Sequence, residues 1–409
     1  MNLVFRLAWR NLWRHPRRTW LTTGAMMFSN MLLVFMISLQ FGMYGVMIDN
    51  TLQAFIGHLQ IQAPGYIDDQ KMRQTVAAIV PLAKSLRAEL PNENIAARAA
   101  GFALLSSEER SYGIAVFGVE PEFETGVSTL PGLIAEGRYL GVDGAAEIII
   151  GAALARNLRV GLGDELTLLG SGRDGSFAAA VVNIVGIFDS GIAEFDRGIS
   201  EIPLGFFQDV FYMDGSGHQV VINHGGIDGV AELQNRVGAL LPTGQELVVH
   251  DWDALQPGLQ QAIKADMSSA FFMYGILVIL VAFSVLNTQL MSVLERTHEF
   301  GIVMSLGLTP GRLGRLVLLE TAIMGVLGLL LGALLGGLVT YWFSINGFAY
   351  PGMDELAAKF NLPARFFPQV SPLSLLLGPA VVFLFSILAA VYPALRLHKL
   401  HPVEAMRAV

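Results

Sequence analysis

Four long stretches without a single charged residue dominate this sequence of 409 residues. They cover residues 19–48, 267–294, 321–353 and 366–395. A helix needs about 20 apolar residues to cross a bilayer, so each stretch is long enough for one transmembrane helix. We expect these helices at residues 19–48, 267–294, 313–344 and 370–395. The first stretch corresponds to about 45 Å of helix and is expected to extend beyond the bilayer.

Glycines are dense in the third stretch. A re-entrant hairpin is therefore an alternative to a continuous helix there. Small residues three and four positions apart also let neighbouring helices pack closely in lipid, and for this reason we favour the continuous helix. The glycines concerned are Gly325, Gly328, Gly332, Gly336 and Gly337.

The charged residues, which make up only 15% of the chain, are divided unevenly. Residues 47–265 carry 27 acidic and 13 basic side chains, a balance of −14, whereas the rest of the chain has a balance of +6. Lys and Arg are retained on the cytoplasmic side of a membrane protein. We therefore expect both termini, including the tail at residues 396–409, in the cytoplasm of a bacterium. Residues 49–266 and the short loop at residues 345–369 are expected in the periplasm.

The N-terminal residues 1–18 form a predicted amphipathic helix. Arg6, Arg10 and Arg14 recur every four residues and so share one helix face, while leucine and tryptophan side chains add apolar surface. A helix of this kind lies at the inner membrane surface with its arginines toward lipid phosphates. Alternatively, these arginines only set the orientation of the first transmembrane helix.

Residues 49–266 mix short apolar runs with Gly, Pro and Asp, which is typical of strands and turns. Segments with a helical period alternate with these runs. The pattern predicts a large α+β domain, inserted between the first two transmembrane helices. The expected strands cover residues 57–62, 114–119, 147–150, 165–169, 178–187 and 246–250, and the expected helices cover residues 75–89, 152–158, 205–212 and 227–241.

The loop at residues 295–312, between the second and third transmembrane helices, combines polar groups with an apolar repeat of helical spacing. A short helix with an apolar face outside the membrane needs something to cover that face. The spacing leaves two covers open, the helical bundle itself and a partner protein. The repeat consists of Phe300, Ile302, Val303 and Leu306.

This loop resembles the coupling helix of the FtsX-like permease family, where the pattern E-R-x-x-E-[FI]-[GA]-[IV]-x-x-x-[LM]-G precedes the third helix. Glu320 also stands where the family often has a glutamate. The arginine-rich start at residues 7–19 and the closing segment at residues 392–407 fit the family too, although Leu397 replaces a small residue. The resemblance implies an ABC transporter permease that is coupled to its ATPase through Glu295, Arg296, Glu299, Phe300, Gly301, Ile302, Leu306 and Gly307.

Three segments of the periplasmic domain refine the resemblance within the FtsX-like and MacB-type permeases. Residues 148–164 resemble the central stretch of the MacB-like periplasmic domain. Residues 185–204 resemble the lipoprotein-releasing LolC and LolE permeases, where G-[IV]-F-x-x-G-x-x-E-x-D is typical, more than the MacB-type exporters, and residues 57–61 indicate the same. We do not find the loop by which one of the two Lol permeases recruits its periplasmic carrier.

Several kinds of site are missing from the sequence. It contains no cysteine, which excludes disulfides and thiolate metal sites. It also lacks the GxxxxGK[ST] phosphate loop, so ATP is expected to bind to a separate subunit, and no other cofactor is expected. The eight histidines follow no zinc-binding pattern, so no metal site is expected. Glu194 and Asp196 could form an acid–base pair, but we interpret them as loop-shaping residues and expect no catalytic site.

The resemblance implies a mechanical function in the inner membrane. Two permease chains, identical or related, pair with each other and with two copies of the ATPase subunit; no nucleic acid partner is expected. ATP hydrolysis then extracts an acylated lipoprotein, which enters between the first two helices from the membrane lipids and passes to a periplasmic carrier. The residues expected along its path are Phe28, Met31, Phe35, Met36, Phe41, Met43, Phe271, Phe272 and Met273.

Three alternatives stay open. Each residue of that path, taken singly, is equally well explained as an ordinary residue that faces lipid or packs between helices. The chain could be a MacB-like exporter of peptides or small amphiphiles. It could also be an FtsX-like signal transducer that activates a cell-wall hydrolase through its external domain without moving any substrate.

Overall fold

A computed structural model of the chain describes residues 3–141, 145–242, 244–349 and 365–397. The chain divides into two compact units. The helical unit comprises Met1–Tyr44, Ile263–Tyr350 and Arg365–Val409, and the sheet unit comprises Gly45–Ala262 and Pro351–Ala364. Most of the loop at residues 345–369, of the tail at residues 396–409 and of the closing motif lies outside the described residues.

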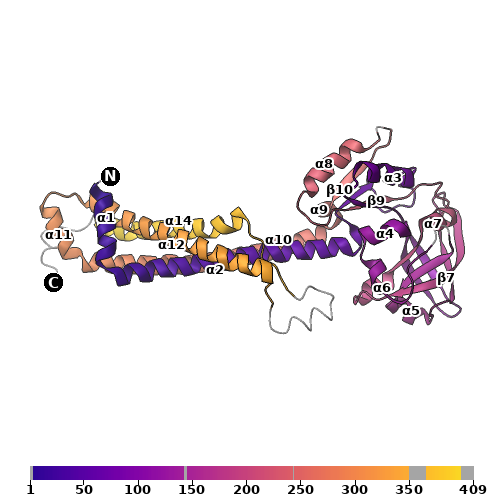
Figure 1. Ribbon diagram of the computed structural model, residues 1–409, viewed down its shortest axis with the longest axis horizontal. Helices are drawn as coiled ribbons and strands as arrows, with labels where there is room; N and C mark the ends of the chain where they lie inside the picture. Colours follow the sequence, from indigo (N-terminus) through magenta and orange to yellow (C-terminus); the bar gives the residue numbers. More distant parts are fainter. Residues whose placement is uncertain (1–2, 142–144, 243, 350–364, 398–409) are drawn as a thin grey trace. The chain divides into compact units, whose positions relative to one another are not determined.

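Four helices in the described part of the chain are long and apolar enough to cross a membrane, as predicted. Two of them, at 36 and 39 residues, are about 54 and about 58 Å long, well beyond the roughly 30 Å core of a bilayer. Figure 1 labels the four as α2 (Pro16–Thr51), α10 (Pro257–Glu295), α12 (Pro310–Asn346) and α14 (Pro372–Arg396). The shorter helices of the helical unit are α1 (Leu3–Arg14) and α11 (Thr297–Ser305).

The glycine-rich third stretch is one continuous helix, α12, so the hairpin alternative is wrong. Gly328, Gly332 and Gly336 face α2 at very short range, whereas Gly325 and Gly337 face α14. A Cβ atom at Gly332 would lie 2.4 Å from the Cβ of Asn30, and one at Gly328 would lie 2.7 Å from the Cβ of Met26. The absence of side chains at these positions therefore allows the two helices to pack in direct contact.

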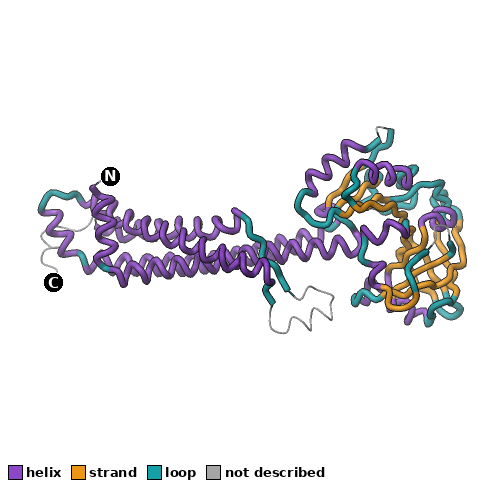
Figure 2. Tube along the Cα trace, viewed as in Figure 1, coloured by secondary structure: helices purple, strands orange, loops and turns teal. Residues whose placement is uncertain are grey.

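The sheet unit is an α+β domain, as predicted. In the described residues, ten strands form one mixed sheet in the order β10-β1-β9-β2-β3-β8-β5-β7-β4, with β6 paired to β2 and β7. The β3–β8 and β5–β7 pairs are parallel, and the other pairs are antiparallel. Figure 2 shows the strands in orange with helices packed around them.

The bounds of these elements follow. The strands are β1 (Leu59–Gln62), β2 (Asn94–Ser106), β3 (Ser111–Val119), β4 (Ile134–Gly137), β5 (Glu147–Gly151), β6 (Glu165–Ser171), β7 (Phe177–Phe188), β8 (Ile199–Pro203), β9 (Gln219–Asn223) and β10 (Val248–Asp251). The helices are α3 (Ile79–Glu89), α4 (Pro121–Val127), α5 (Ala152–Leu158), α6 (Ala193–Gly198), α7 (Leu204–Val210), α8 (Val230–Leu240) and α9 (Trp252–Leu255). A π-helical turn η1 (Leu52–Ile56) and a 3₁₀ turn η2 (Leu130–Leu133) complete the set.

Two predicted helices begin later than expected, and both delays have a backbone cause. Helix α3 starts at Ile79 because Val76 forms a β-bridge with Gly217 and Ala78 adopts a left-handed conformation with φ of 46°. Helix α8 starts after Gly229, which has φ of 89°. A left-handed residue cannot continue into a right-handed helix, so each one marks a boundary.

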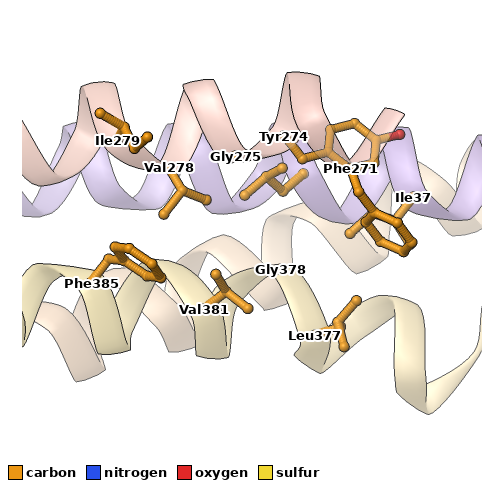
Figure 3. A pocket seen from close by; sticks show the side chains of 11 residues that line it. Ile37, Phe271, Tyr274, Gly275, Val278, Ile279, Leu377, Gly378, Val381 and Phe385 are labelled. Atoms are coloured by element: carbon orange, nitrogen blue, oxygen red, sulfur yellow. The ribbon is translucent and has the colours of Figure 1, made fainter. Parts of the chain in front are cut away.

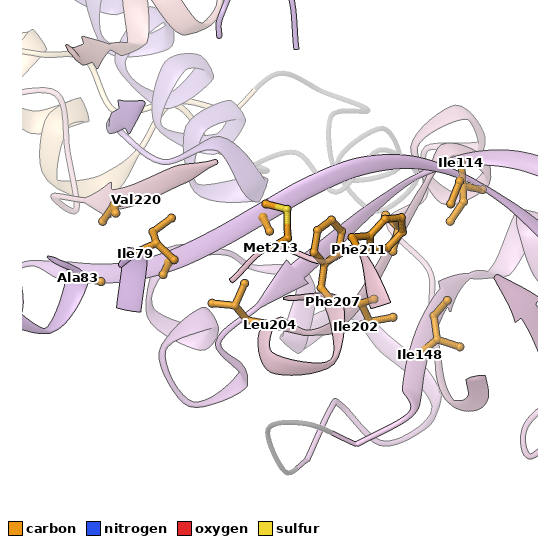
Figure 4. Packing of buried hydrophobic residues seen from close by; sticks show 14 of the residues in the cluster. Ile79, Ala83, Ile114, Ile148, Ile202, Leu204, Phe207, Phe211, Met213 and Val220 are labelled. Atoms are coloured by element: carbon orange, nitrogen blue, oxygen red, sulfur yellow. The ribbon is translucent and has the colours of Figure 1, made fainter. Parts of the chain in front are cut away.

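The core of the sheet unit lies between the sheet and its helices. Figure 4 shows Phe207 and Phe211 side by side near Met213, and the two rings stack with centroids 4.4 Å apart. Both phenylalanines are fully buried. Burial of such side chains stabilises a domain by about 1.5–3 kcal/mol each, which allows this cysteine-free unit to fold without disulfides.

A buried charge cluster joins the end of the first long helix to this sheet. Arg98 of β2 is fully buried and donates to both carboxylate oxygens of Glu124 and to the carbonyl of Phe55 in η1. Its guanidinium carbon lies 4.2 Å from the centre of the Phe55 ring. Glu201, also fully buried, accepts a 2.7 Å hydrogen bond from the hydroxyl of Tyr139. Burial raises the pKa of Glu201 to about 8, and the nearby carboxylate of Glu124 adds to the increase.

Replacing Glu201 by Gln is predicted to flatten the pH dependence of stability. The pKa of Glu201 is about 8 in the folded protein and 4.5 in an ordinary environment, so the folded state binds an extra proton between these values. Its contribution to stability is fully present below about pH 4.5 and is lost as the pH rises to about 8. Thermal unfolding from pH 5.5 to 9 should show the melting temperature of the unmodified protein falling relative to that of the variant up to about pH 8, with a constant difference above that pH. Parallel curves would contradict this assignment.

Candidate functional site

Helix α11 presents one buried face and one exposed face. Phe300, which is 2% exposed, packs with Met304 and Leu313 in an apolar cluster between α11 and α12. Leu306, which is 81% exposed, and Ile302 remain uncovered. Of the two covers that the spacing left open, the helical bundle covers Phe300 and Met304, while Ile302 and Leu306 stay exposed.

The eight predicted coupling residues fall into two groups. One group is buried in the bundle and fixes α11 in place, namely Arg296, Phe300 and Gly301. The other group is wholly or partly exposed and is available for contact, namely Glu295, Glu299, Ile302, Leu306 and Gly307.

A network of ion pairs holds α11 to its neighbours. Arg296, which is buried, donates to both carboxylate oxygens of Glu320 on α12 at 3.2 Å, and Asn11 of α1 donates to the same carboxylate at 2.8 Å. Glu299 lies 3.5 Å from Arg14 of α1. These polar contacts connect α11 to both α1 and α12.

An apolar cavity lies between α2, α10 and α14. Its volume is about 200 Å³. Figure 3 shows Phe271 and Val278 of α10 facing Leu377, Val381 and Phe385 of α14 across this space. The remaining lining residues are Leu33, Ile37, Tyr274, Gly275, Ile279 and Gly378.

Four polar side chains join α2 to α10 at one end of this cavity, and we call them the polar clasp. Tyr44 donates a 2.6 Å hydrogen bond to the carboxylate of Asp266. The amide nitrogen of Gln40 donates to the hydroxyl of Tyr44 at 2.7 Å and to Asp266 at 3.2 Å. Tyr274, which also lines the cavity, donates from its hydroxyl to the side-chain amide oxygen of Gln40 at 2.8 Å. The clasp therefore holds together two of the three helices that line the cavity.

The structure does not bring the predicted path residues together. Phe271 lines the cavity, but Phe272 and Met273 next to it are mostly exposed, because successive residues of a helix point in different directions. Phe35 packs against Phe343 and Phe348, with ring centroids 5.4 and 5.6 Å apart. The other path residues are exposed or partly exposed, namely Phe28, Met31, Met36, Phe41 and Met43.

Sequence reasoning missed most of the cavity lining, although a signal was present. Leu33 and Ile37 on α2 and Leu377, Val381 and Phe385 on α14 recur at four-residue intervals. Such a period marks one face of a helix. Selecting residues by face, rather than by methionine and phenylalanine content, would have found these positions.

Two family models match the chain. The model of the MacB-like periplasmic core domain matches residues 19–239, slightly more than half of the chain. The model of the FtsX-like permease C-terminal domain matches residues 271–402, which include α11 and the α10 and α14 walls of the cavity.

Curated relatives and a solved structure are also similar to the chain. The lipoprotein-releasing system transmembrane protein LolC of Xylella fastidiosa (strain Temecula1) is 25% identical over 317 residues, covering 73% of this chain and 74% of the relative. LolC of Neisseria meningitidis serogroup B is 22% identical over 324 residues, or 75% of each protein. The extracellular domain of the noncanonic ABC-type transporter YknZ from Gram-positive bacteria is 14% identical with a TM-score of 0.36, covering 47% of this chain and 99% of that domain.

Proposed function

Because the chain belongs to the family of ABC transporter permeases that carry a MacB-like periplasmic core domain and an FtsX-like permease domain, we propose that it releases lipoproteins from the inner membrane. ATP hydrolysis by a separate subunit drives the release. The LolC relatives, similar over about three quarters of the chain, support this choice of cargo over peptides.

The observation that carries the proposal is the apolar cavity beside the polar clasp. No charged side chain lies among the described residues that line this cavity, which suits acyl chains. Its 200 Å³ is below the roughly 300–1,000 Å³ of typical ligand pockets, so α2 and α10 must separate before a lipoprotein enters. Each CH₂ of an acyl chain contributes about 0.8 kcal/mol to its hold in the bilayer, which makes ATP-driven work necessary.

The exposed side of α11 is the surface on which the ATPase acts. Ile302 and Leu306 offer it apolar contact, and the half-exposed Glu299 adds a polar group at the edge. Movement of α11 then passes through Arg296 and Glu320 into α12. The chain itself binds no cofactor in this mechanism, because ATP stays on the partner.

The charge distribution supports the orientation that we propose. Both termini and the loop at residues 295–312 lie in the cytoplasm, and residues 49–266 lie in the periplasm, since the acidic excess is concentrated there. The apolar outer face of α10, which includes Phe272, Leu280 and Phe283, contacts lipid or the second permease chain. Two permease chains and two ATPase copies form the working complex, and a periplasmic carrier accepts the cargo.

Replacing Leu306 by Asp is predicted to abolish ATPase docking without unfolding the permease. The side chain is 81% exposed, and substitutions at such positions change stability by no more than about 0.5 kcal/mol. Co-purification of the ATPase should fall at least tenfold, while the melting temperature of the permease stays unchanged. Leu306→Met, which keeps the apolar surface, should retain binding.

A second variant separates contact from packing at the same helix. Phe300→Ala removes a buried ring and should destabilise the permease by about 3–5 kcal/mol. Normal ATPase binding by Leu306→Asp would show that the docking surface lies elsewhere.

A photo-crosslinking residue at Phe271 is predicted to trap acylated lipoprotein in cells. Position 271 lines the cavity, whereas the neighbouring position 272 is 74% exposed and serves as the matched control, which should trap mainly phospholipid. Trapping at 271 should disappear when the acylation cysteine of the cargo is mutated. A soluble peptide trapped there would favour an exporter, and a cell-wall hydrolase recruited in place of any lipoprotein would favour a signal transducer.

A further inference from the structure

A second cavity, of about 610 Å³, lies entirely within the sheet unit. Its walls come from three segments, namely residues 50–56, residues 129–133 and residues 190–199. The first segment is the end of α2 with η1, the second contains η2, and the third lies within residues 185–204, the stretch that resembles the Lol permeases. We call this cavity the Phe55 pocket, because the ring of Phe55 forms part of its wall.

Hydrogen bonds and ring contacts fix all three walls. The buried Arg98 holds the carbonyl and the ring of Phe55, and the ring of Phe117 lies 4.6 Å from the Phe55 ring. The backbone N–H of Thr129 donates to the carbonyl of Gln53 at 3.0 Å, which joins the second wall to the first. These contacts leave the Phe55 pocket formed before any ligand arrives, which lowers the entropic cost of binding.

The third wall is fixed by a buried carboxylate. Asp196, which is 2% exposed, accepts a 2.6 Å hydrogen bond from the hydroxyl of Ser190 and a 3.1 Å bond from its backbone N–H. Burial raises the pKa of Asp196. This geometry agrees with the loop-shaping role of Asp196, and it presents Ile192 and Phe195 to the pocket.

The lining selects for an uncharged, apolar ligand. No Asp, Glu, Lys, Arg or His side chain lies among the described residues that form it. Leu130, Leu133, Ile192 and Phe195 supply apolar surface, while Asn, Gln, Thr and Ser side chains supply neutral hydrogen-bonding groups. The volume falls within the roughly 300–1,000 Å³ of sites for small organic ligands. An apolar chain that ends in a neutral ester or amide group matches this lining.

We propose that the Phe55 pocket binds one acyl chain of the cargo after that chain has left the bilayer; the identity of the cargo rests on the function proposed above. Every CH₂ of an acyl chain that is exposed to water is unfavourable, so a periplasmic holding site lowers the barrier to release. Because the wall includes η1, a bound acyl chain also contacts the turn that continues directly from α2.

Photolabelling of the full-length purified protein with the methyl ester of a diazirine-bearing palmitate, which is uncharged, tests this inference. Peptide mapping should find the label in residues 129–133 and 190–199, and excess unlabelled methyl palmitate should remove it. Leu133→Trp, which fills the pocket, and Ile192→Glu, which places a charge on a side chain that is 55% exposed, should each lower this labelling at least fivefold. Ile192 is exposed enough for its variant to fold even if the Leu133 variant does not.

Phe177→Trp is the matched control, because Phe177 is a 72% exposed apolar residue of the same unit outside the Phe55 pocket. Labelling spread equally over exposed apolar surfaces, and unchanged in both pocket variants, would overturn the inference. So would a photo-crosslinker at Ile192 that captures only a second permease chain. The labelling uses no lipoprotein, so its result does not depend on whether the proposed function is correct. If the pocket variants lose labelling but still release lipoprotein normally, this inference alone is overturned.

Discussion

The hydrogen bonds between α2 and α10 determine what the rest of the helical unit can do. Gln40, Tyr44, Asp266 and Tyr274 hydrogen-bond to one another across the two helices, beside a cavity whose described lining is apolar apart from Tyr274. With the clasp closed, the cavity volume of about 200 Å³ is below that of typical ligand pockets. A lateral opening for a lipid-anchored cargo therefore begins with the exchange of these bonds for bonds to water.

The energies indicate which end of the helical unit opens. Asp266 is exposed, so water replaces each lost bond of the clasp at a net cost of about 0.5–1.5 kcal/mol. Arg296 and Glu320 are buried, and breaking such an ion pair costs about 3–5 kcal/mol. In the proposed mechanism, the helices therefore separate at the clasp while the α11 end stays intact. A force on α11 is transmitted through the buried ion pair, and the weaker hydrogen bonds of the clasp break.

The transmembrane helices were predicted well from the sequence because charged side chains are unfavourable in lipid. Each of the four helices therefore contains a long run without charged residues. The coupling loop was predicted from a spaced motif, but burial of Arg296 and Phe300 depends on α12, which no local pattern reveals. Strand β2 was missed because Ala96, Ala97, Ala99 and Ala100 favour helix locally, whereas pairing with β3, β6 and β9 makes the segment a strand. The cavity lining was missed for a related reason, since α14 supplies one wall and its facing residues emerge only when three helices are packed.

Covalent locking of the clasp is the most direct test of the mechanism. Because the chain contains no cysteine, a thiol cross-linker will react only at cysteines introduced into it. Tyr44→Cys and Asp266→Cys can be joined by a short, reducible thiol cross-linker in the complete complex, reconstituted with ATPase and lipoprotein. The account predicts that ATP-driven release stops when the linker is attached and returns after reduction, while the ATPase remains bound throughout. Undiminished release from the linked protein would show that α2 and α10 need not separate, and would contradict it.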